Sequence, residues 1–164
     1  KSMNQFYFLF LVSILFVYLV LCAQFESFKF PLIIMLSVPL TLMAPLAAII
    51  LFENSLNIFS QIGLIILIGI SAKNGILIVE FARQMKIKGE NSYNSIIDAC
   101  KMRFRPIIMT GFSTVIGIAP LLIGSGAGYE SRLTIGIVLV TGIIFSIILT
   151  LFFTPFFFKI IDKD

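Results

Sequence analysis

Lys73 is the residue whose charge most needs a chemical explanation in this sequence. It lies in the run GISAKNG at residues 69–75, near the middle of an apolar segment long enough to cross a bilayer. A charged side chain at the centre of a spanning helix costs about 2.5–3.5 kcal/mol, and such a residue usually faces a bundle interior or a wet cavity and pairs with an opposite charge. A lysine that only snorkels to water is the alternative. Lys73 lies ten residues from Arg83, about 15 Å of helix, which argues against it.

The sequence offers Lys73 no obvious partner. Glu80 lies seven residues further on and shares its helix face, but the two are about 10 Å apart along the axis. We expect Glu80 to pair with Arg83 or with interfacial water. Because no other acidic residue falls inside an apolar segment, the simplest partner for Lys73 is a carboxylate from outside this chain.

A second apolar segment supplies further polar candidates. Arg103 and Thr110 are seven residues apart and share a helix face. A structural role for Thr110 stays open, since an isolated Thr in such a helix usually bonds to a backbone carbonyl of its own helix.

The elements that carry these residues are those of an all-α membrane protein. Of the 164 residues, 59% are hydrophobic and 12% are charged, against about 45–50% and about 25% in soluble domains. Five segments reach the roughly 20 apolar residues that a spanning helix needs. We expect one transmembrane domain over residues 1–164, with helices near 5–25, 30–52, 57–83, 103–123 and 131–159.

Basic residues orient these helices. Nine of the twelve Lys and Arg residues fall on one side of the predicted membrane and two on the other, with Lys73 between them. The positive-inside rule therefore places the long connection of residues 83–102 in the cytoplasm. Within it, Tyr93, Ile96, Ile97 and Cys100 recur at helical spacing after Ser92. They predict a short interfacial helix at about 92–101, although an ordinary connector helix fits the pattern equally well.

Small residues recur at every fourth position from Gly142 to Thr154 in the last segment. This spacing places four small side chains on one helix face. It favours close contact with a neighbouring helix.

Other kinds of site find no support in the sequence. The chain has no His and two Cys, so nothing indicates a metal site or a disulfide framework. The glycines at residues 124–128 lack the strand and the Lys-Ser/Thr pair of a nucleotide-binding loop. We expect no cofactor, no nucleic-acid partner and no enzymatic activity. The start at Lys1 without a Met, and the odd number of spans, predict a piece of a longer chain.

Two stretches carry a family resemblance. Residues 69–82 (GISAKNGILIVEFA) resemble the tenth transmembrane helix of resistance–nodulation–division (RND) multidrug efflux pumps of the hydrophobe/amphiphile branch. Residues 102–110 (MRFRPIIMT) resemble the start of the eleventh. The whole chain is similar to helices eight to twelve of a twelve-helix bundle built from two repeats.

The resemblance implies a proton-driven exporter of amphiphilic compounds in the bacterial inner membrane. It implies a homotrimer that works with a periplasmic adaptor and an outer-membrane channel, in contact with membrane lipids. Lys73 and Thr110 match the family's relay lysine and threonine, Arg103 an arginine at the foot of the same pathway, and Asn74 the residue beside the lysine. The relay aspartates belong to a helix of the first half, so this chain would supply half of the relay. We therefore expect Lys73 and Thr110 to face each other.

Two other functions are weighed against transport. A non-transport membrane module of related architecture, such as a sterol-sensing or protein-export helper bundle, has a similar helix pattern, but the SAKN motif at residues 71–74 argues against it. A channel needs a ring of polar residues or a filter of carbonyl groups, and no segment offers either.

Overall fold

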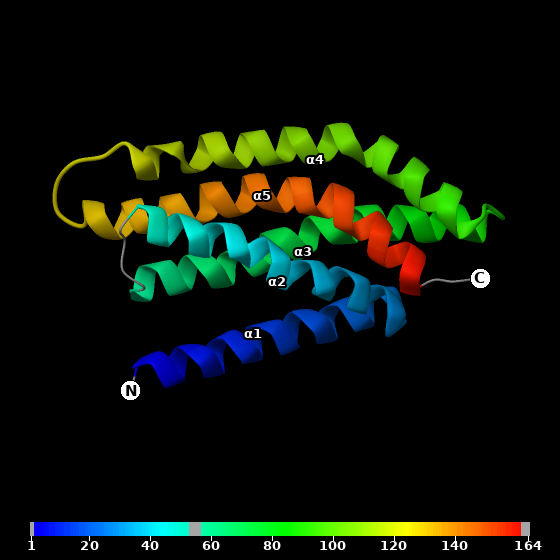
Figure 1. The fold of residues 1–164 in the computed structure, drawn as a ribbon, viewed down its shortest axis with the longest axis horizontal. Coiled ribbons are helices and arrows are strands. Elements are labelled where there is room, and N and C mark those ends of the chain that lie inside the picture. The colour runs from blue at the N-terminus through cyan, green and yellow to red at the C-terminus, as the bar shows by residue number, and fades with distance from the viewer. Residues whose placement is uncertain (1, 53–56, 162–164) are drawn as a thin grey trace.

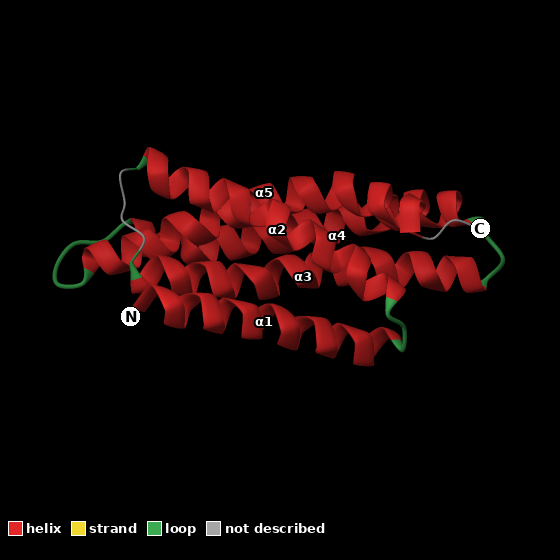
Figure 2. Cartoon of the chain, turned by 60° about the horizontal axis from the view of Figure 1, so that its bottom comes forward, coloured by secondary structure: helices red, strands yellow, loops and turns green. Residues whose placement is uncertain are grey.

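The computed structural model describes residues 2–52 and 57–161, and this part of the chain forms five helices (Figures 1 and 2). The helices are α1 (Ser2–Phe25), α2 (Lys29–Leu51), α3 (Ile58–Ile87), α4 (Ser92–Leu122) and α5 (Tyr129–Ile161). Each is long and apolar enough to cross a membrane. The prediction of five long apolar helices is therefore confirmed. Lys1 and Lys163, two of the basic residues counted above, lie outside the described residues.

α5 is the central packing element of the bundle. It contacts α2, α3 and α4, whereas α1 contacts α2 and α3. Figure 1 shows α1 and α4 on opposite sides, with the helices alternating in direction and the two termini at opposite ends. This is the arrangement that five successive spans produce.

Local sequence signals set the ends of α3. The side chain of Asn57 accepts a hydrogen bond from the backbone N–H of Ser60 at 3.0 Å and caps the first turn. After the last turn, Gly89 has a φ of +98°, which a residue without a Cβ adopts at little cost. The tight turn at Gly89 leads directly into α4.

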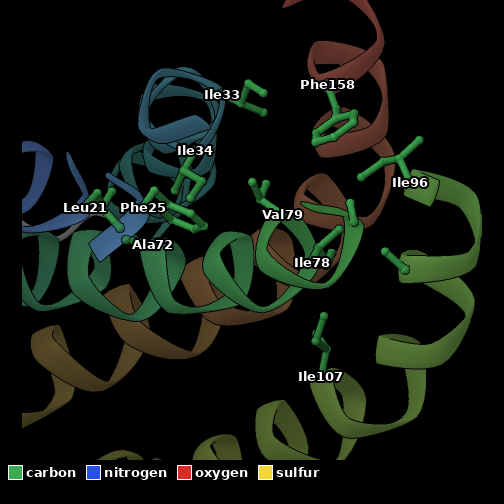
Figure 3. Packing of buried hydrophobic residues seen from close by; sticks show 12 residues of the cluster. Leu21, Phe25, Ile33, Ile34, Ala72, Ile78, Val79, Ile96, Ile107 and Phe158 are labelled. Carbon is green, nitrogen blue, oxygen red and sulfur yellow. The ribbon is translucent and has the colours of Figure 1, made fainter. Parts of the chain in front are cut away.

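Two apolar clusters hold the helices together. The first draws on all five helices, and Figure 3 shows its side chains meeting, among them Ile78 of α3, Ile107 of α4 and Phe158 of α5. The second joins α2, α3 and α5 around Leu67, which is 0% exposed. Because lipid is as apolar as these side chains, close packing rather than escape from water stabilises such contacts.

The small-residue face of α5 is a packing surface, as predicted. Gly142, Ser146, Thr150 and Thr154 are all buried. A Cβ on Gly142 would collide with both δ-methyl groups of Leu67 on α3. The two helices therefore approach each other closely at this point.

The structure has one helix where the sequence predicted two. Residues 92–122 form the uninterrupted α4 in place of a short helix at 92–101 and a separate span at 103–123. The residues between the two expected helices include no helix breaker before Pro106, so the backbone hydrogen bonds continue. The buried face of the first turns also differs from the prediction: Ser95, Ile96 and Ala99 are buried, whereas Tyr93 is 56% exposed. Figure 3 shows the helix changing direction between Ile96 and Ile107. The position of these turns at the membrane interface stays a prediction.

Candidate functional site

One side of α3 is left uncovered by the rest of the described chain. We call it the open face, and it is formed by Ile62, Ile66, Gly69, Lys73, Glu80 and Gln84. These residues recur at helical spacing. The other sides of α3 contact α1, α2, α4 and α5.

Lys73 lies in the middle of the open face and is exposed. Among the described residues, no hydrogen bond or ion pair to its ammonium group is found. The helices of the described chain leave this side chain uncovered.

Asn74 lies on a different side of α3 from Lys73. Successive residues of an α-helix are rotated by about 100°, and Asn74 is only 6% exposed. One turn earlier, Ser71 donates a hydrogen bond to Oγ1 of Thr41 on α2 at 3.2 Å. The SAKN motif thus divides between an inner face that packs and an open face that carries the charge.

Thr110 is exposed on α4, and the structure does not join it to Lys73. Its hydroxyl donates to the backbone carbonyl of Ile107 at 3.1 Å. No hydrogen bond between Lys73 and Thr110 is found among the described residues. The back-bond uses the hydroxyl proton and leaves the oxygen lone pairs available as acceptors for a donor such as an ammonium group. The predicted approach of the two side chains stays a prediction.

Arg103 ties the beginning of the α4 span to α3. Its Cζ lies 5.2 Å from the centroid of the Phe81 ring, a distance at which the ring quadrupole attracts a guanidinium. Its Nε is buried and has no hydrogen-bond partner among the described residues. The sequence analysis did not predict this contact between Arg103 and Phe81, although Phe81 belongs to the stretch 69–82 that resembles the family.

Glu80 does not pair with Arg83, one of its two expected partners; the other, interfacial water, stays a prediction. The side-chain amide of Gln84 donates to Oε1 of Glu80 at 3.2 Å. Arg83 turns away, and its Cζ lies 6.0 Å from the centroid of the Phe30 ring on α2. The signal that could have indicated this bond is the spacing of four between Glu80 and Gln84, which places them on one helix face.

Charged side chains are the main chemical groups of this site. No group of three or more His, Cys, Asp or Glu side chains gathers there as a metal site would require. What the arrangement offers is a cation in an apolar span, a second cation at its edge and a carboxylate on the same open face. These groups can bind ions or exchange protons with partners that lie outside this chain.

Comparison with known proteins identifies the family. The sequence profile of the AcrB/AcrD/AcrF family matches residues 1–162. The chain belongs to this family. The RND resemblance drawn from residues 69–82 and 102–110 is therefore confirmed, and the family consists of multi-pass membrane transporters rather than enzymes.

Individual relatives are similar along nearly the whole chain. The toluene efflux pump membrane transporter TtgB of Pseudomonas putida is 43% identical over 155 residues, which cover 94% of this chain. The multidrug resistance protein MdtF of Escherichia coli is 40% identical over 162 residues, or 98% of this chain. The chain spans 15–16% of the length of these relatives.

Proposed function

We propose that this chain is the C-terminal transmembrane part of a proton-driven exporter of amphiphilic compounds, to which it contributes half of the proton relay. The unpaired Lys73 supports the proposal most strongly. A membrane-embedded ammonium group is retained only with a compensating partner, and this bundle supplies none among its described residues. The named activities of the relatives, export of toluene and multidrug resistance, support the export of apolar and amphiphilic compounds.

In the proposed cycle, the open face of α3 lies against a helix of the first half that carries the relay aspartates. While these are ionised, they attract Lys73. Their protonation removes the attraction, and the lysine is free to move toward Thr110, whose oxygen accepts a hydrogen bond. A charge that changes partners can move whole helices, because packed interfaces have discrete arrangements. This motion would couple proton entry to export.

The other site residues have supporting roles in this proposal. Arg103, held over Phe81, fixes a positive charge at the cytoplasmic foot of the pathway. Asn74 anchors the turn that carries Lys73 through its buried position. The complete pump is proposed to be a homotrimer in the bacterial inner membrane, joined to a periplasmic adaptor and an outer-membrane channel.

The test is Lys73→Ala in the complete pump, with efflux of a fluorescent substrate measured in cells that contain equal amounts of pump. Lys73 has no partner in the described bundle, so its loss should change the stability of this part by no more than about 0.5 kcal/mol. Without the ammonium group, burial disfavours the ionised aspartates and raises their pKa. They would stay protonated and could not release the proton.

We expect the variant to insert, to assemble and to bind its compounds, but not to export them. Lys73→Arg should restore little, because a planar guanidinium is a poor substitute for a mobile ammonium group. Near-normal export by Lys73→Ala would show that the lysine is structural and would refute the relay.

A further inference from the structure

Glu80 and Lys73 share the open face of α3. Both are part of the stripe that no other helix of the described chain covers. Seven residues separate them, which is two turns or about 10 Å of helix axis. Glu80 is half-buried and lies on the cytoplasmic side of Lys73 if the predicted topology holds.

The carboxylate of Glu80 has no basic partner among the described residues. It accepts the amide of Gln84 at Oε1. The nearby cations are engaged elsewhere: Arg83 lies over Phe30, and Arg103 of α4 lies over Phe81.

Two further lysines lie near this end of the bundle. Lys86, six residues after Glu80, projects from another side of α3, since six residues correspond to about 240° of rotation. From α5, Lys159 lies over the ring of Tyr93, 5.3 Å from its centroid. None of these cations forms a described ion pair with Glu80.

The two unpaired charges are within reach of each other. Helical side chains tilt toward the N-terminus of their helix, so the Glu80 side chain leans toward Lys73, whereas the Lys73 side chain starts in the opposite direction and must turn back. An extended lysine side chain of five single bonds reaches about 6 Å, and a glutamate of three bonds reaches nearly 4 Å. Together they cover the separation if the lysine turns toward the cytoplasm.

We propose that Glu80 is a second carboxylate partner for Lys73, which receives the ammonium group when the relay carboxylates outside this chain are protonated. This inference rests on the proposed relay. The lysine would alternate between a carboxylate pair on another helix and the released state, in which Glu80 balances its charge while Thr110 accepts its hydrogen bond. It would never be left unpaired in the membrane, where isolated charges are costly.

The arrangement has a consequence for the pH dependence of export. When the relay carboxylates are protonated, Lys73 is released and Glu80 stabilises it. Glu80 therefore allows the relay carboxylates to be protonated at a higher pH. An opposite charge at about 4–6 Å typically changes a protonation equilibrium by 1–3 pH units. Replacing Glu80 by an uncharged residue should therefore move the pH of half-maximal export to lower values.

The experiment compares Glu80→Gln, Glu80→Asp and the parent in the complete pump, with export measured across a range of external pH at equal pump levels. We expect Glu80→Gln to lower the pH of half-maximal export by about one unit or more, and acidic medium to restore its rate. Glu80→Asp keeps the charge on a shorter side chain, so its shift should be in the same direction and smaller. Asp98→Asn is the matched control, because it removes an exposed carboxylate that pairs with Lys101 at 3.4 Å. It should leave the profile unchanged.

The outcomes separate this inference from the proposed function. If Lys73→Ala is inactive but Glu80→Gln has the parent's pH profile, the second partner is refuted and the relay stands. A loss of export by Glu80→Gln that is equal at every pH also refutes it, because a structural role does not depend on protonation. If Lys73→Ala exports normally, the relay itself fails. If the Glu80→Gln pump does not accumulate in cells, the Glu80→Asp pump serves as the test. An unshifted pH profile of export by Glu80→Asp would then overturn the inference.

Discussion

Replacing Gly142 with alanine adds one methyl group where α5 lies closest to α3. The new Cβ would collide with one δ-methyl group of Leu67, lie 2.7 Å from the other and lie 3.1 Å from Cγ. Leu67 is fully buried among apolar side chains of α2, α3 and α5. Because Leu67 is fully buried, it can turn away from the new methyl group only by pressing on its neighbours, or the helices must move apart.

The expected cost follows from two opposing terms. Overpacking a tight core costs about 1–3 kcal/mol, whereas alanine in a helix interior is about 1 kcal/mol more favourable than glycine. We expect Gly142→Ala to destabilise the pump by up to about 2 kcal/mol.

Gly111 of α4 provides a matched comparison. Its Cβ would also collide with a neighbour, the δ-methyl group of Ile147 on α5. Ile147 borders a groove of about 320 Å³ between α4 and α5, into which that methyl group can turn. A strained rotamer costs about 0.5–1.5 kcal/mol, which the helix propensity of alanine nearly offsets. We expect Gly111→Ala to be close to neutral.

The assay is the fraction of purified full-length pump that stays folded after heating, measured by size-exclusion chromatography. Each kcal/mol should lower the midpoint by about 2–4 °C if this bundle unfolds like a domain of 150–250 residues. A lower midpoint is expected for Gly142→Ala and an unchanged one for Gly111→Ala. Equal midpoints for the two variants, or the reverse order, would refute the reasoning from free space.

Two further predictions follow from the predicted topology and from the contact between α2 and α3. In a pump without native cysteines, Lys88→Cys should react only with a membrane-permeant thiol reagent, and Ser125→Cys should react with an impermeant one; the opposite pattern would invert the topology. Thr41→Val should destabilise the heated pump more than Ser71→Ala, because it leaves the buried Ser71 donor without its acceptor. Equal midpoints would mean that Ser71 finds another acceptor.

The sequence was sufficient for the number of helices because composition decides it. Uncharged runs of bilayer length admit one kind of structure, since every backbone group must be satisfied within the segment. The sequence also predicted a boundary near residue 102 that the structure does not have. The charged residues from Lys101 to Arg105 are compatible with helix, and α4 continues through them.

The candidate site was predicted less completely than the fold. The position of Lys73 inside an apolar helix could be foreseen, because it depends on composition alone. The rotamers of Arg83 and Arg103 could not, because both guanidinium groups lie over aromatic rings, Phe30 and Phe81, whose positions follow from helix packing. The contact expected between Lys73 and Thr110 depends on helices outside this chain, and no pattern within it determines the distance.

The division of α3 into an inner and an open face has a genetic consequence. Substitutions at inner positions such as Ser71 and Gly75 disturb contacts with helices of this chain, so compensating second-site changes should arise nearby in the same chain. Substitutions at open-face positions such as Gly69 and Lys73 disturb nothing in the described bundle, and their compensating changes should map outside it. A screen that compares the suppressors of inner-face and open-face substitutions would then identify the surface that covers α3. It would do so without a structure of the whole pump.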